Sequence, residues 1–134
     1  ENYVTMIFVD SGVWIDYFNG LDSKQTNKLN DTLGVNPVAV GDLILTEVLQ
    51  GFREDKDYTA AKALFEDLII FDLVGKDIAI KSAANFRTLR KKGITIRKPV
   101  DAIIATFCIE RKLPLLFLDK DFEPFVKHFG LSEA

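Results

Sequence analysis

Five acidic residues are the side chains of this sequence best suited to chemistry: Asp10, Glu47, Asp101, Asp119 and Asp121. Carboxylates brought close together repel one another and raise each other's pKa, and a divalent cation removes that repulsion. Oxygen ligands of this kind suit Mg²⁺ or Mn²⁺, with water completing the coordination. A metal ion held this way would activate a water molecule and stabilise charge on a phosphate.

Other catalytic groups are scarce in the sequence. His128 is the only histidine, which excludes a nuclease that works with a histidine pair. Cys108 is the only cysteine, and neither it nor Ser11 has a plausible base partner, so a nucleophilic triad is disfavoured. There is no glycine-rich phosphate loop. Metal-assisted hydrolysis is therefore the chemistry that the residues favour.

Each acid also has an interpretation that involves no chemistry. Asp10, Asp119 and Asp121 precede predicted helices, where aspartate is a common N-cap. Asp101 could cap a helix too, but it enters the apolar segment 100–109, where a carboxylate needs a cation or several hydrogen bonds. Glu47 lies in the middle of a predicted helix, so capping does not explain it. Its alternative is a position at the edge of the core, in contact with water or an ion-pair partner.

The segments that must position these acids alternate between strands and helices. Apolar strands are predicted at residues 6–10, 36–40, 69–73 and 115–118, and helices at residues 12–18, 21–33, 42–53, 58–68, 76–92, 99–112 and 122–129. We expect Asp42 to cap the third helix and Gly93 to end the fifth. The pattern predicts an α/β fold with a mainly parallel sheet covered on both faces. In such sheets, sites form beyond the carboxyl ends of the strands, where Asp10 and Asp119 lie.

The 134 residues are predicted to form a single domain with one core, since 48% are hydrophobic and 28% are charged. No apolar run is long enough to span a membrane, and no signal peptide is recognisable. Together with the single cysteine, these features favour a cytoplasmic protein. Residues 1–5 precede the only methionine, Met6, and are interpreted as either an expression remnant or a natural extension.

Charge is distributed unevenly along the chain. Seven basic residues and no acidic ones fall between positions 81 and 98: Lys81, Arg87, Arg90, Lys91, Lys92, Arg97 and Lys98. The net charge is −3, so the rest of the chain carries −10 once these seven charges are subtracted. Acidic and basic poles of this kind could hold a cation at one and phosphates at the other. The alternative is a solvated helix end and loop.

Four stretches resemble VapC-type toxins of the PIN-domain family: MIFVDSGVWIDYFNG, LILTEVLQGFR, RKKGITIRKPVDAIIATFCIERKLPLLFLDKDFEPF and HFGL. They occur in the family's order between Met6 and Leu131. The resemblance implies a three-layer α/β/α sandwich, a Mg²⁺- or Mn²⁺-dependent endoribonuclease, a VapB-like antitoxin and a homodimer. By position, it implies that the catalytic, metal-holding acids are Asp10, Glu47, Asp101 and Asp119, with Asp121 as an additional metal acid.

The basic residues gain a role in this interpretation, because Arg87, Arg90, Arg97 and Lys98 would bind RNA phosphates. Arg97 and Lys98 are the stronger candidates, since they lie close to Asp101 in the sequence. An antitoxin could compete with RNA by inserting a basic side chain among the acids.

The sequence departs from the family at two positions. Gly12 stands where the family usually has a hydroxyl or amide residue, which leaves Ser11 as the nearest, auxiliary hydroxyl. Phe117 stands where the family often has threonine, serine or histidine. These departures keep open a second interpretation, in which the fold is a catalytically weakened module that binds a protein or RNA.

Two other enzyme folds and one surface role are alternatives for parts of this sequence. LLFLDKDF resembles the motif of haloacid-dehalogenase phosphatases, but Glu123 replaces their threonine or valine and almost no chain follows. A phospho-accepting receiver domain needs a paired acid after its first strand, whereas Ser11 follows Asp10. Helically spaced aromatic residues are predicted to be core, with a partner groove as the alternative: Trp14, Tyr17 and Phe18.

Overall fold

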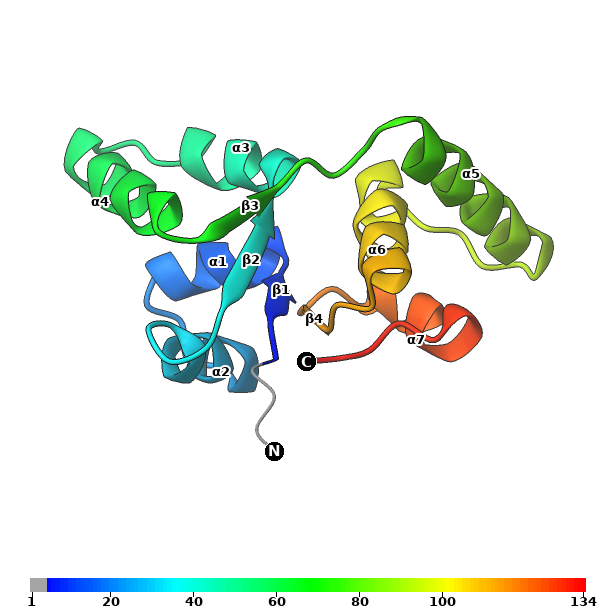
Figure 1. Cartoon of the computed structure of the whole chain (residues 1–134), viewed down its shortest axis with the longest axis horizontal. Coiled ribbons are helices and arrows are strands. Elements are labelled where there is room, and N and C mark those ends of the chain that lie inside the picture. Colours follow the sequence, from blue (N-terminus) through cyan, green and yellow to red (C-terminus); the bar gives the residue numbers. More distant parts are fainter. Residues whose placement is uncertain (1–4) are drawn as a thin grey trace.

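Four parallel strands form one sheet with the order β3-β2-β1-β4 in the computed structural model, which describes residues 5–134 (Figure 1). The strands are β1 (Ile7–Val9), β2 (Val38–Gly41), β3 (Ile69–Phe71) and β4 (Leu115–Leu116). The predicted α/β class with its parallel sheet is confirmed. The interpretation of residues 1–5 falls outside the described residues for all but Thr5.

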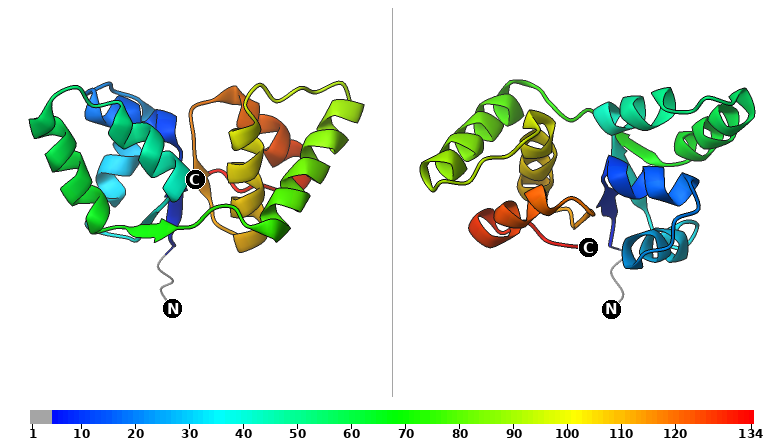
Figure 2. Two further views of the ribbon diagram at one scale, coloured as in Figure 1. Left: turned by 90° about the horizontal axis from the view of Figure 1, so that it is seen from above. Right: turned by 180° about the vertical axis from the view of Figure 1, so that it is seen from behind.

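Helices cover both faces of the sheet, as expected for the three-layer sandwich (Figures 1 and 2). The chain crosses from β1 to β2 and β3 in one direction and returns to β4 in the other, and right-handed crossovers then place the connecting helices on opposite faces. One side holds α1 (Ser11–Phe18), α2 (Lys24–Thr32), α3 (Asp42–Gln50) and α4 (Asp55–Glu66). The other side holds α5 (Lys76–Lys91), α6 (Pro99–Arg111) and α7 (Glu123–Phe129).

The two central strands are buried along their whole length, which explains why their sequences are continuously apolar. Strand β3 differs, because Ile69 and Ile70 on this edge are 38% and 40% exposed. The helices that cover both faces of the sheet thus leave this edge strand partly exposed. Strand β4 is also shorter than predicted and ends at Leu116.

Asp42 does not cap α3, contrary to the prediction, because the cap position is taken by Gly41. Asp42 is the first helical residue, and its Oδ1 accepts a hydrogen bond from the N–H of Leu73 at 3.2 Å, which ties α3 to the segment after β3. Gly41 is required by close packing, since a Cβ there would lie 2.5 Å from the Leu73 side chain. Gly93 follows the end of α5 with a φ of 79°, as predicted.

The aromatic residues of α1 belong largely to the core on the α1–α4 side. Trp14 is completely buried and packs edge-on against Phe65, with ring centroids 4.8 Å apart. Phe18 is half-buried, and its ring centroid lies 5.3 Å from that of Phe52. It is therefore partly exposed at the surface between α1 and α4. The core interpretation is confirmed for Trp14.

No helix within residues 5–134 is both long and apolar enough to cross a membrane.

Candidate metal centre

The carboxyl ends of β1 and β4 meet at one edge of the sheet. Val9 pairs with Leu116, and the N–H of Asp10 donates to the carbonyl of Leu116 at 3.0 Å. Asp10 therefore starts α1 at the level where the chain leaves β4 for the 3₁₀ helix η1 (Lys120–Phe122), which Asp119 precedes. Acids from opposite ends of the chain converge because these two strands are neighbours, as the sequence suggested.

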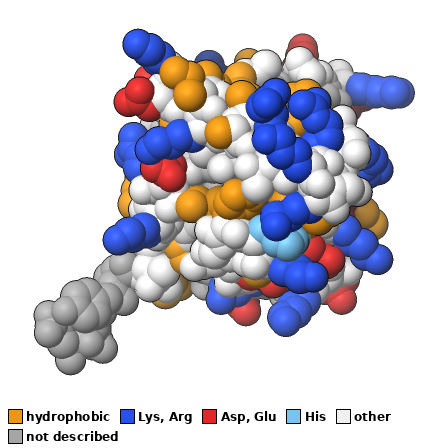
Figure 3. Space-filling model, turned by 90° about the vertical axis from the view of Figure 1, so that its right-hand side faces the viewer, with side chains coloured by type: hydrophobic (Ala, Val, Ile, Leu, Met, Phe, Trp, Pro, Cys, Tyr) orange, Lys and Arg blue, Asp and Glu red, His pale blue; other side chains and the backbone are white. Residues whose placement is uncertain are grey.

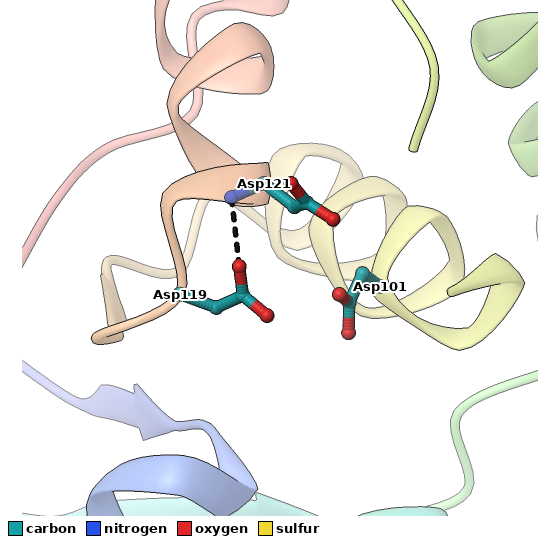
Figure 4. Close-up of side chains that lie close together, drawn as sticks. All are labelled: Asp101, Asp119 and Asp121. Carbon is teal, nitrogen blue, oxygen red and sulfur yellow. Dashed lines mark hydrogen bonds between the residues drawn. The ribbon is translucent and has the colours of Figure 1, made fainter. Parts of the chain in front are cut away.

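Three aspartates point toward the same space in this region (Figure 4). Asp101 lies in the first turn of α6, whereas Asp119 and Asp121 belong to the turn after β4. One carboxylate oxygen from each lies within 4.8 Å of the others. This is the spacing that a single cation, or a cation with its water molecules, could bridge.

An open pocket of about 380 Å³ contains most of the predicted acids. Asp10, Glu47, Asp101 and Asp119 all line it, and so does Ser11. Asp121 is not among its lining residues and reaches the group only through the aspartate triad. The predicted acids are thus brought together from β1, α3, α6 and the turn after β4.

One further acid in the pocket was missed by the sequence reasoning. Asp16 on α1 lines it together with Gly12. The two residues are four positions apart, so they share one face of the helix. Gly12 lies two positions after Asp10, and Asp16 lies one helical turn after Gly12. This spacing could have predicted that Asp16 faces the same pocket.

Asp10 occupies the N-cap position of α1 but makes no side-chain capping hydrogen bond. Its Oδ1 is buried, and within residues 5–134 no group donates to it. Burial raises the pKa of Asp10 to about 6, with a further contribution from Glu47, although the N–H groups of Ser11 and Gly12 partly oppose this shift. Capping therefore does not account for this carboxylate.

Asp101 is likewise not explained as a helix cap. Lys98 takes the cap position of α6, and Asp101 Oδ2 is buried without a hydrogen-bond partner among the described residues. The pKa of Asp101 is raised to about 7, mainly by burial and then by the charges of Asp10 and Asp119, while Lys98 partly opposes the shift. The carboxylate is thus held among other acids in an environment that disfavours its charge.

Asp119 combines capping with a position in the site. Its Oδ1 accepts a hydrogen bond from the N–H of Asp121 at 2.9 Å, as expected for an N-cap. Its other oxygen, Oδ2, lies 4.0 Å from Lys98 Nζ. One oxygen thus fixes the turn while the second stays available for another cation.

These side chains fit a hard divalent cation. The donor set is made of carboxylate oxygens, and two buried oxygens, Asp10 Oδ1 and Asp101 Oδ2, lack protein partners within the described residues. A divalent cation would offset both the burial and the mutual repulsion that raise the pKa values of Asp10 and Asp101. Glu47 is exposed and lies on the α3 wall of the same pocket.

The four predicted RNA-binding residues separate into two pairs. Arg97 contacts Asp119 and Asp121, and Lys98 lines the acidic pocket. Arg87 and Arg90 are exposed on α5, where Arg90 lies over the Phe86 ring. Lys and Arg side chains are spread over the face of the molecule on the α5 side (Figure 3).

The two departures from the family pattern have different structural settings. A Cβ on Gly12 would meet no atom of residues 5–134 within 4 Å, so a small side chain would fit there. Phe117 is 5% exposed and packs on Phe122 with ring centroids 5.2 Å apart. Phe117 therefore belongs to the core, whereas Ser11 lines the pocket.

Comparison with known proteins gives a consistent result. The PIN domain family matches residues 7–126. A VapC ribonuclease from Mycobacterium bovis and ribonuclease VapC11 from Mycobacterium tuberculosis are each 26% identical over 132 residues, covering 96% of this chain and 98% of the relative. DNA-bound VapBC from Salmonella typhimurium superposes with a TM-score of 0.73 at 15% identity over 98% of both chains. VapC20 from Mycobacterium tuberculosis, a sarcin-ricin loop cleaving toxin, gives 0.69 at 18% identity over 96% of this chain and 98% of its own.

Proposed function

Because the chain belongs to the PIN-domain family, we propose that it is a metal-dependent endoribonuclease and the toxin of a toxin–antitoxin pair. The observation that carries the proposal is the convergence of Asp10, Asp101 and Asp119, with two buried carboxylate oxygens that no described group satisfies. The names of the relatives, which match over nearly their full length, support the same activity. Carboxylate ligands favour Mg²⁺ or Mn²⁺.

Different residues of the pocket would have different roles in phosphodiester hydrolysis. Asp10, Asp101 and Asp119 would hold the cation, which when bound supplies an activated water molecule and stabilises charge on the phosphate. Glu47 faces the same pocket from α3, where it can accept a hydrogen bond or a proton from water. Lys98 at the rim supplies positive charge for the phosphates of RNA.

An antitoxin segment of the VapB kind would fit the groove beside the acids. This groove is apolar and lies between α1 and α3, where it is lined by Ile15, Phe18, Val48 and Phe52. It shares Ile15 and Glu47 with the acidic pocket. An apolar segment in the groove could therefore place a basic side chain among the carboxylates. Phe52→Asp should weaken binding of the antitoxin while RNA cleavage persists, and unchanged binding in a pull-down would reject the groove.

Total cellular RNA is the most general substrate for testing the activity, because the target sequence is unknown. We expect discrete fragments with Mn²⁺ or Mg²⁺ and none with EDTA. Asp101→Asn should abolish cleavage, whereas Asp72→Asn, which changes an exposed acid of the segment between β3 and α5, should cleave normally. Circular dichroism checks that both variants fold.

Two outcomes would reject the ribonuclease proposal. Cleavage that persists in EDTA or in Asp101→Asn would come from a contaminant or from other chemistry. RNA binding without any cleavage would favour the weakened binding module, for which the missing hydroxyl at Gly12 is the supporting observation.

A homodimer and a cytoplasmic location are further parts of the proposal, which sedimentation and cell fractionation would test.

A further inference from the structure

Arg97 connects the two acids that follow β4. Its Nε donates to Asp121 Oδ2 at 3.0 Å, and its Nη2 donates to Asp119 Oδ1 at 3.2 Å. The backbone N–H of Arg97 also donates to Asp121 Oδ2, at 3.3 Å. The side chain of Arg97 is 69% exposed, whereas those of Asp119 and Asp121 are 21% and 19% exposed. The guanidinium therefore approaches the acids from the solvent side.

The guanidinium and a divalent cation would draw on the same group of carboxylates. Asp119 and Asp121 belong to the triad whose oxygens lie within 4.8 Å of one another, and both are bound by Arg97. A cation placed among these oxygens repels the guanidinium and weakens its hold on them. Because Arg97 is largely exposed, its side chain can leave without opening the core.

Phosphate is a suitable second partner for the released side chain. A guanidinium binds phosphate oxygens with the same planar, two-pronged geometry with which it binds carboxylates. Arg97 also lies beside Lys98, which lines the acidic pocket where a phosphate would be cleaved. The side chain would therefore exchange one pair of oxygens for another over a short distance.

We propose that Arg97 is a positioning residue that binds Asp119 and Asp121 before the metal arrives and passes to an RNA phosphate once the metal is bound. The inference rests on the proposed ribonuclease function. Without RNA, Arg97 competes with the metal. With RNA, it supports binding, so metal and RNA reinforce each other.

Arg97→Gln and Lys98→Gln form a matched pair, because each removes one positive charge at adjacent exposed positions. The Lys98 side chain makes a single long contact with the acids, at 4.0 Å, whereas the Arg97 side chain makes two hydrogen bonds with them. Mn²⁺ affinity is measured by calorimetry without RNA. Affinity for a short fluorescent single-stranded RNA is measured by anisotropy with Mn²⁺ and with EDTA, and a denaturing gel monitors whether the RNA is intact.

The proposal predicts effects of opposite sign for Arg97→Gln. Mn²⁺ should bind about 1.4- to fivefold more tightly, the range expected for loss of an exposed ion pair. RNA should bind more weakly when Mn²⁺ is present, and the gain in RNA affinity that Mn²⁺ produces should shrink. Lys98→Gln should weaken RNA binding equally with Mn²⁺ and with EDTA, and should change Mn²⁺ affinity less.

Several results would overturn the role of Arg97. Weaker binding of both Mn²⁺ and RNA to Arg97→Gln, with a lower melting temperature, would mean that Arg97 only supports the fold of the turn. An unchanged gain in RNA affinity from Mn²⁺ would mean that the guanidinium does not reach phosphate. A protein that binds Mn²⁺ and RNA without cutting would reject the proposed function, but the two affinities would still decide the role of Arg97.

Discussion

Replacing Asp10 by asparagine should stabilise the metal-free protein. Asp10 is buried, lies near Glu47, and has one oxygen without a partner among the described residues, so its negative charge is costly in the folded state. Asparagine has nearly the same shape and removes that charge. The same substitution removes a proposed metal ligand, so stability and metal binding should change in opposite directions.

The size of the effect follows from the pKa of Asp10, which rises from 3.8 to about 6 on folding. Each pKa unit corresponds to ~1.4 kcal/mol, so the charged side chain lowers the free energy of unfolding by at most about 3 kcal/mol. The sign depends on pH. Below 3.8 the carboxyl is protonated in both states and costs nothing; the penalty then grows up to about pH 6 and stays constant above it. Asp10→Asn should thus gain stability at neutral pH and none in acid.

Urea unfolding in EDTA at several pH values measures this gain, and the melting temperature should rise by on the order of 10 °C at neutral pH. Asp72→Asn, which alters an exposed acid, should change little and serves as the control. Adding Mn²⁺ should stabilise the wild type and leave Asp10→Asn unchanged. If Asp10→Asn were less stable than the wild type in EDTA at neutral pH, the carboxylate would be making favourable contacts and our account of its raised pKa would be wrong.

Three other changes test separate parts of the structure. Gly41→Ala should lower the free energy of unfolding by about 1–3 kcal/mol, because its Cβ would lie 2.5 Å from the Leu73 side chain, and an unchanged urea midpoint would refute this. Mn²⁺ affinity should rise as pH increases through 6 and 7, because Asp10 and Asp101 lose their protons there; a flat calorimetric profile would contradict their role as ligands. Gly12→Ser should fold normally and increase RNA cleavage by restoring a hydroxyl, and equal rates would show that the hydroxyl is not limiting.

The convergence of the acids could be predicted because it depends on rules that act along the chain. Asp10 and Asp119 follow apolar strands, and the alternation of strands and helices indicated a parallel sheet whose carboxyl ends share an edge. Asp101 was a conspicuous charge in an apolar helix. The burial of that helix also explains why Asp101 Oδ2 is buried and has no hydrogen-bond partner among the described residues. The resemblance to the PIN-domain family is confirmed by the match over residues 7–126.

Side-chain contacts between distant segments could not be predicted in this way. The sequence placed Arg97 near Asp101 but gave no sign that its guanidinium would bind Asp119 and Asp121, because that contact depends on how the loop before α6 meets the turn after β4. The sequence indicated only that Phe117 replaces a polar residue of the family's site. The structure shows that it packs on Phe122 in the core. The roles of the individual acids and basic residues stay predictions until the variants are measured.

The pairing of the first strand with the last one, in which Phe8 lies beside Leu115, also determines when the site can exist during protein synthesis. A ribosome adds 108 residues between Asp10 and Asp119, so the two acids cannot meet until both have left the exit tunnel. A growing chain that still lacks β4 therefore has no assembled carboxylate pocket. For a protein proposed to cut RNA, this order keeps the nascent chain inactive beside the RNA from which it is being translated.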